Sequence, residues 1–135
     1  MDAIITQHEL DERVAFLRRF KNTLLRQRDR FQHYLDLLER GIDADADPEE
    51  ALEFQVTLEE AVQREIDAFE RTIAPLEVLY HAHRDSDHTD IPEIRAALRR
   101  TRDEVLRRAC MNRHRLKLQI ERAEGLRRPA ESIGA

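Results

Sequence analysis

Three long stretches of the chain repeat apolar residues every three or four positions, and this spacing restricts the fold more than any other feature. In an α-helix such a repeat gathers the apolar side chains on one face, which then needs a covering partner. The first stretch predicts a helix over residues 8–40, and its apolar positions are Leu10, Val14, Leu17, Leu24, Phe31, Leu35 and Leu38. We expect these side chains to face the protein interior.

The second and third stretches carry similar stripes. The second predicts a helix over residues 48–82, with the stripe Leu52, Val62, Ile66, Phe69, Ile73, Leu76 and Tyr80. The third predicts a helix over residues 91–125, with the stripe Ile94, Leu98, Thr101, Val105, Ala109, Asn112, Leu116, Ile120 and Ala123. Pro75 lies inside the second stretch, and because proline removes a backbone hydrogen bond, we expect a kink near residues 72–74.

Residues typical of helix ends separate the stretches. Gly41 follows the first stretch as a C-cap glycine. Asp47 and Glu50 have the spacing of a capping box at the start of the second, and Asp90 opens the third in the same way. Gly125 should end the third helix.

The composition supports long helices joined by short connections. Charged residues make up 38% of the chain, which has only three Gly and four Pro. The predicted fold is all-α, an elongated antiparallel three-helix coiled-coil bundle. We expect one domain over residues 8–128, a flexible tail over 1–7 and a disordered tail over 129–135. Because residues 43–77 are acidic and residues 90–128 are basic, we expect the second helix to lie beside both others.

The second half of the third helix is apolar on two sides. At about 100° per residue, Leu116 and Ile120 continue the stripe, whereas Leu118 aligns with Met111 on the opposite side. Two explanations remain open: isolated surface leucines are common, or a partner helix covers Met111 and Leu118. Asn112 lies on the stripe, where its amide would either fix the register inside the bundle or hydrogen-bond a bound helix.

Several other functions find little support in the sequence. No apolar run approaches the ~20 residues that span a bilayer, and the first residues lack the features of a signal peptide. We therefore expect a cytoplasmic protein without membrane insertion. The sequence has no Gly-rich phosphate loop and no paired Cys and His, so we expect no catalytic residues, no cofactor and no enzyme activity.

Two segments rich in ionisable residues also have simple explanations. His81, His83 and His88 lie close to several Asp residues, a group suited to zinc or nickel, but their spacing matches no fixed motif. We expect a polar loop and no metal. The third helix is basic, yet the net charge is −5 and all seven aromatic residues lie outside this helix. We therefore expect its arginines to pair with the acidic second helix rather than to bind nucleic acid.

Four segments carry a more specific signal. They are "LLRQRDRFQHYLDLLERG" in the first helix, "LEEAVQREIDAFERTIAPLEVLY" in the second, and "DIPEIRAAL" followed by "NRHRLKLQIERAEGLR" in the third. In these segments, and over roughly residues 8–126, the sequence resembles the flagellar export chaperones of the FlgN type, chiefly their spirochete members. The resemblance implies a cytoplasmic helical protein that holds hook-filament junction proteins before type III secretion.

The resemblance also implies a binding site at the end of the last helix, where the family grips amphipathic C-terminal helices of its clients around an Asn followed by a Leu pair. Asn112 matches the Asn and Leu116 the second Leu, whereas Arg115 stands in place of the first Leu. The predicted client-binding residues are Met111, Asn112, Leu116, Leu118 and Ile120. The implied partners are hook-associated proteins and the flagellar export apparatus. The alternative is a structural coiled-coil protein that forms homo-oligomers through the third helix, without chaperone activity.

Overall fold

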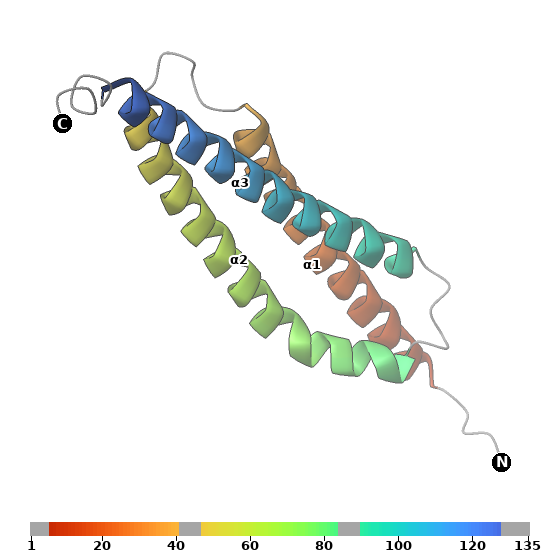
Figure 1. Ribbon diagram of the computed structural model, residues 1–135. Helices are drawn as coiled ribbons and strands as arrows, with labels where there is room; N and C mark the ends of the chain where they lie inside the picture. Colours follow the sequence, from red (N-terminus) through yellow and green to blue (C-terminus); the bar gives the residue numbers. More distant parts are fainter. Residues whose placement is uncertain (1–5, 41–46, 84–89, 128–135) are drawn as a thin grey trace.

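The computed structural model describes residues 6–40, 47–83 and 90–127, and these residues form three α-helices. The helices are α1 (Gln7–Glu39), α2 (Pro48–His83) and α3 (Ile91–Arg127). Figure 1 shows an elongated bundle in which α2 runs in the opposite direction to α1 and α3. The predicted all-α three-helix bundle is therefore confirmed. None of the described helices is long and apolar enough to cross a lipid bilayer.

A capping box sets the start of α1. The Thr6 hydroxyl accepts a hydrogen bond from the Glu9 amide at 3.2 Å, and the Glu9 carboxylate accepts one from the Thr6 amide at 3.4 Å. These reciprocal bonds satisfy two amides that lack partners at a helix start. Gln7 is consequently helical rather than part of the predicted tail. The helix ends at Glu39, and the predicted cap Gly41 lies outside the described residues.

Asp47 precedes α2, as predicted. Its Oδ1 atom accepts a hydrogen bond from the Glu49 amide at 3.4 Å, and its carbonyl accepts one from the Ala51 amide at 2.9 Å. Pro48 occupies the first helical position, where its missing N–H has no cost. The long side-chain bond indicates a weak cap.

The start of α3 follows the prediction, but its end does not. The Asp90 carbonyl accepts a hydrogen bond from the Ile94 amide at 3.0 Å. The expected stop at Gly125 is wrong, because α3 continues past this residue. A glycine weakens a helix but ends it only when its backbone leaves the helical conformation. Residues 1–5 and 129–135, which cover most of the two predicted tails, lie outside the described residues.

Pro75 lies inside α2, which remains a continuous helix. Figure 1 shows that α2 bends in its C-terminal third, the part that contains Pro75. Proline offers no N–H to the carbonyl of Arg71, and the Thr72 hydroxyl donates to the Ala68 carbonyl at 2.9 Å. Both features weaken the backbone ladder on one side, so the helix bends without breaking.

The hydrophobic core runs along the bundle and takes one stripe from each helix. Its buried members are Phe16, Phe20, Leu24, Phe31, Leu35, Leu38, Leu58, Val62, Ile66, Ile73, Tyr80, Ile91, Ile94, Leu98, Val105 and Ala109. The Phe20 ring stacks on Tyr80, with ring centroids 4.8 Å apart, and on Phe16, with centroids 6.0 Å apart. The Arg95 guanidinium lies over the Tyr80 ring at 5.3 Å. Aromatic packing therefore fills the core at the end of the bundle where α3 begins.

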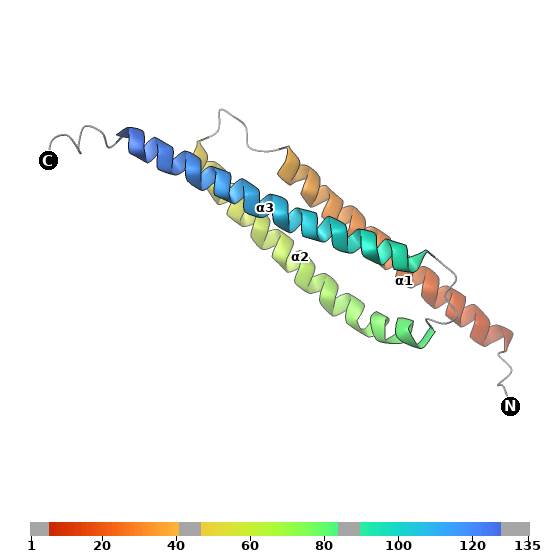
Figure 2. The ribbon, with the colours of Figure 1, turned by 45° about the vertical axis from the view of Figure 1, so that its right-hand side comes forward.

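The predicted stripe of α1 is wrong in its first half. Leu10 and Val14 are 46% and 49% exposed, whereas Phe16 and Phe20 are buried. The Lys21 ammonium pairs at 2.7 Å with the carboxylate of Asp90, the residue before α3. The earlier turns of α1 consequently project beyond the start of α3 (Figure 2), which agrees with the exposure of Leu10 and Val14.

α3, not α2, packs extensively against both other helices. α2 does lie beside both other helices, as expected from its charge, but α1 and α2 contact each other much less than either contacts α3. Charge does select individual pairs: Arg113 Nε lies 3.1 Å from Glu59 Oε1, and Arg95 Nη2 lies 2.8 Å from Glu77 Oε2. Such pairs at a surface are worth only ~0.2–1 kcal/mol each. Apolar burial, centred on α3, therefore decides the arrangement.

Candidate functional site

Two buried glutamines hydrogen-bond across the interfaces between helices. Gln27 of α1 donates to Glu65 Oε1 of α2 at 3.3 Å, and Gln55 of α2 donates to the Ala109 carbonyl of α3 at 3.3 Å. Their side chains are 7% and 3% exposed. Neither was predicted to be buried, although each lies three or four residues from apolar members of its stripe, a spacing that could have identified both. A buried amide must find a partner, so each glutamine favours one alignment of its two helices.

Asn112 supplies a third buried amide, between α3 and α1. Its Nδ2 atom donates to the Leu38 carbonyl at 3.0 Å. That carbonyl belongs to the last turn of α1, where carbonyls have no partner within the helix. Of the two roles predicted for Asn112, the structure supports the one inside the bundle. Leu116, one turn further along α3, is fully buried.

On the opposite side of this part of α3 lies a surface that we call the outer face. It is formed by Met111, His114, Arg115, Leu118, Gln119 and Arg122, which line a shallow depression. All six side chains are exposed, and the two apolar ones are 42% exposed at Met111 and 37% at Leu118. Residues three, four or seven positions apart share a helix face. The outer face is thus an apolar pair with basic flanks.

The five predicted client-binding residues do not share one surface. Met111 and Leu118 belong to the outer face, Asn112 and Leu116 face the interior, and Ile120 is half-buried. Helix geometry explains the division, since a difference of two positions turns a side chain by about 200°. In this conformation Met111, Leu118 and part of Ile120 are accessible to another protein.

The unpaired cations of the outer face were missing from the predicted site. Among the described residues, no ion pair involves Arg115 or Arg122. Arg107, just before the outer face, is instead held by Glu104, with its Nε atom 3.0 Å from Glu104 Oε2. This hydrogen bond lowers the pKa of Glu104 and raises the pKa of Arg107. Arg115 and Arg122 lie three residues before and four residues after Leu118, and this spacing could have predicted that they share its helix face.

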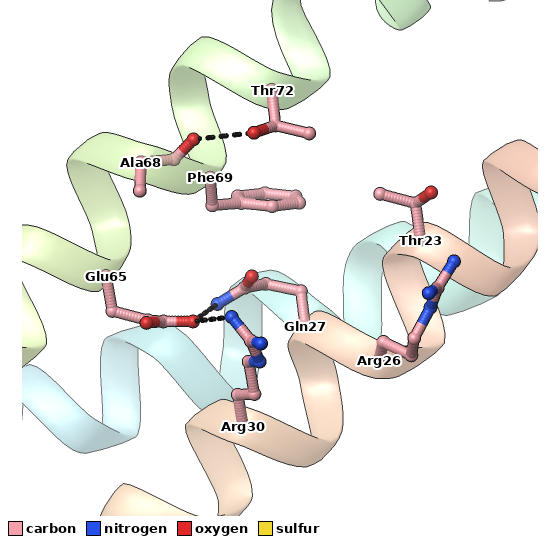
Figure 3. A pocket seen from close by; sticks show the side chains of 8 residues that line it. All are labelled: Thr23, Arg26, Gln27, Arg30, Glu65, Ala68, Phe69 and Thr72. Atoms are coloured by element: carbon pink, nitrogen blue, oxygen red, sulfur yellow. Dashed lines mark hydrogen bonds and ion pairs between the residues drawn. The ribbon is translucent and has the colours of Figure 1, made fainter.

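A separate cleft of about 270 Å³ lies between α1 and α2 (Figure 3). Its walls are mainly polar, and Phe69 contributes an aromatic side. Glu65 Oε1 accepts hydrogen bonds from Gln27 at 3.3 Å and from Arg30 at 2.9 Å. The Glu65 carboxylate is therefore already matched by neighbouring donors, and Figure 3 shows the three side chains converging.

The structure describes only part of the histidine-rich segment. His81 Nε2 lies 4.0 Å from Glu77 Oε2, whereas residues 84–89, including His88, lie outside the described residues. Across residues 6–40, 47–83 and 90–127, no cluster of three or more His, Cys, Asp or Glu side chains has a geometry suited to a metal ion.

Comparison with known proteins shows a distant similarity. The chain is similar to an uncharacterized protein of Treponema pallidum (strain Nichols), with 29% identity over 119 residues, which cover 87% of this chain and 77% of the relative. No known family matches the chain, and no solved structure matches it.

Proposed function

We propose that this protein is a cytoplasmic flagellar export chaperone. It would bind amphipathic C-terminal helices of hook-associated proteins at the hook-filament junction and keep them unassembled before type III secretion. The resemblance to FlgN-type chaperones over residues 8–126 supports this function, and the helical bundle agrees with the fold that it implies. The relative in Treponema pallidum, a spirochete, agrees with the spirochete character of the motifs.

One structural observation carries the proposal: the second half of α3 has apolar residues on two opposite sides. Leu116 is fully buried in the bundle, while Met111 and Leu118 remain exposed on the outer face. The bundle is complete without these two side chains, so they are available to a partner helix.

The proposed mechanism requires reversible binding of a client helix and no chemical reaction. An amphipathic client helix would bury its apolar stripe on Met111 and Leu118, which gains about 25 cal/mol per Å² of apolar area. Ordering the client helix cancels much of this gain, which keeps the complex reversible. A chaperone that must release its client for secretion requires this balance.

Substitution of Leu118 tests the proposal. Leu118→Asp should weaken binding of a hook-associated client at least about tenfold, or ~1.4 kcal/mol, in calorimetry. Its unfolding should remain that of the parent, because the side chain is outside the core. Val78→Asp is the matched control, since Val78 is 70% exposed on α2, away from the site. Leu116→Asp should reduce both stability and binding. Unchanged client binding by Leu118→Asp would contradict the site.

A structural coiled-coil protein is the second candidate, favoured by the exposed Leu10 and Val14 on the free end of α1. These residues could pair with another copy of the chain. Light scattering separates the two functions. A chaperone should have a mass near 16.0 kDa alone and form a complex with the client. A structural protein should form larger assemblies of itself that do not change when the client is added.

A further inference from the structure

The charges around the exposed apolar pair restrict what can bind there. Arg115 and Arg122 lie within one turn of Leu118 on either side, and His114 lies between Met111 and Leu118. Among the described residues, no carboxylate lines this depression. A helix that buries its apolar stripe on Met111 and Leu118 would therefore bring its own flanking side chains close to two arginines.

Arg115 and Arg122 differ from those cations of α3 that face neighbouring helices. Arg95 and Arg113 pair with carboxylates of α2, and Arg108 Nη2 lies 3.8 Å from Glu39 of α1. Within the described parts of the chain, Arg115 and Arg122 have no such partner. Folding uses the first group of cations and leaves the second group exposed beside an apolar surface.

The same charges disfavour a second copy of the chain on this face. A symmetric pair would place the outer face of one copy on the outer face of the other. Arg115 and Arg122 would then meet their own counterparts, and like charges at an interface are repulsive. A partner with negative flanks avoids this repulsion.

We propose that the outer face selects amphipathic helices whose apolar stripe is flanked by Asp or Glu side chains. This inference rests on the proposed client-binding function and adds a charge requirement to it. The apolar pair supplies the contact area. The two arginines supply the preference, because each can form charge-assisted hydrogen bonds with a carboxylate.

Three synthetic helical peptides of about 21 residues, or three heptads, test the preference. The first has a Leu stripe with Glu flanks, the second has the same stripe with Lys flanks, and the third has Glu flanks with Ser in place of Leu. Binding is measured by fluorescence anisotropy with the full chain. The first peptide should bind at least about tenfold more tightly than either of the others. Its binding should weaken when the ionic strength rises from about 0.05 M to 0.5 M.

Reversing the charges of Arg115 and Arg122 then tests whether these two residues cause the preference. The double variant Arg115→Glu with Arg122→Glu should bind the Lys-flanked peptide more tightly than the Glu-flanked one. The double variant Arg18→Glu with Arg64→Glu is the control. Both residues are exposed on other helices, neither forms an ion pair with another described residue, and the net charge changes equally. This control should keep the preference of the parent. Circular dichroism verifies that both variants are folded.

Several outcomes would overturn the inference. They are equal binding of the Glu-flanked and Lys-flanked peptides, equal binding of the Ser peptide, no binding of any peptide, and loss of the preference in the control variant. Dimerisation of the parent through α3 would also overturn it. The proposed function has its own test in the binding of a hook-associated client. A client that binds equally well to the parent and to the charge-reversed variant would leave that function standing while this inference fails.

Discussion

Replacing Asn112 should reveal how much one buried amide contributes to stability. The side chain is 7% exposed, and its Nδ2 atom lies 3.0 Å from the Leu38 carbonyl. Asn112→Ala removes the donor and leaves a buried carbonyl without its partner, which costs about 1–3 kcal/mol. Urea denaturation followed by circular dichroism should show a loss of this size.

Asn112→Asp separates the hydrogen bond from the packing. Near pH 7 a carboxylate at this position faces the Leu38 carbonyl with no proton to donate, so this variant should be less stable than Asn112→Ala. Burial raises the pKa of the introduced acid above its usual ~3.9. Its penalty should therefore be absent below about pH 4 and grow as the pH rises through the folded-state pKa. Each variant is compared with the parent at the same pH.

Two results would refute this reasoning about Asn112. One is a stability of Asn112→Ala within ~0.3 kcal/mol of the parent, which lies below the cost of an unpaired buried carbonyl. The other is a difference between Asn112→Asp and Asn112→Ala that does not change with pH. Either result would show that the hydrogen bond to Leu38 is not needed for the alignment of α3 with α1.

Four further substitutions test the fold. Phe20→Ala should lower the free energy of unfolding by about 3–5 kcal/mol, because it removes a fully buried ring. Val14→Ala should change it by less than ~0.5 kcal/mol, because Val14 is exposed. Guanidinium titration of both variants checks which side of α1 faces the core. Asp47→Ala should cost about 0.5 kcal/mol in the same titration, at the low end for a cap, since its bond is long. Pro75→Ala should raise the melting temperature, because it restores a backbone hydrogen bond at an exposed position. A lower melting temperature would mean that the bundle needs the bend in α2.

The helices were predictable because their signals are local. Apolar spacing and the caps at Asp47 and Asp90 depend on a few neighbouring residues, and the observed helices start close to the expected positions. The register of early α1 was not predictable in this way. Leu10 and Val14 fit a heptad as well as Phe16 and Phe20 do, and the choice depends on where α3 begins, a contact between distant parts of the chain.

The candidate site was predictable only in part. The opposite orientations of Leu116 and Leu118 follow from helix geometry, and the structure has them on opposite sides of α3. The position of Asn112 on the stripe was also clear from the sequence, but its partner Leu38 lies 74 residues away. The spacing of Arg115 and Arg122 predicts that they lie beside Leu118, but their lack of an ion pair among the described residues could be recognised only after the carboxylates of the other helices had been located.

The order of the helices along the chain has a consequence for protein synthesis. A ribosome releases α1 and α2 first, yet these two helices share the smallest interface of the bundle. The helix that packs extensively against both is α3, which is made last. A nascent chain that ends before Ile91 therefore lacks most of the contacts that cover its apolar stripes. Folding of the bundle should begin only after α3 has left the ribosome, and a chain that does not yet contain α3 should be the form most exposed to proteolysis and aggregation.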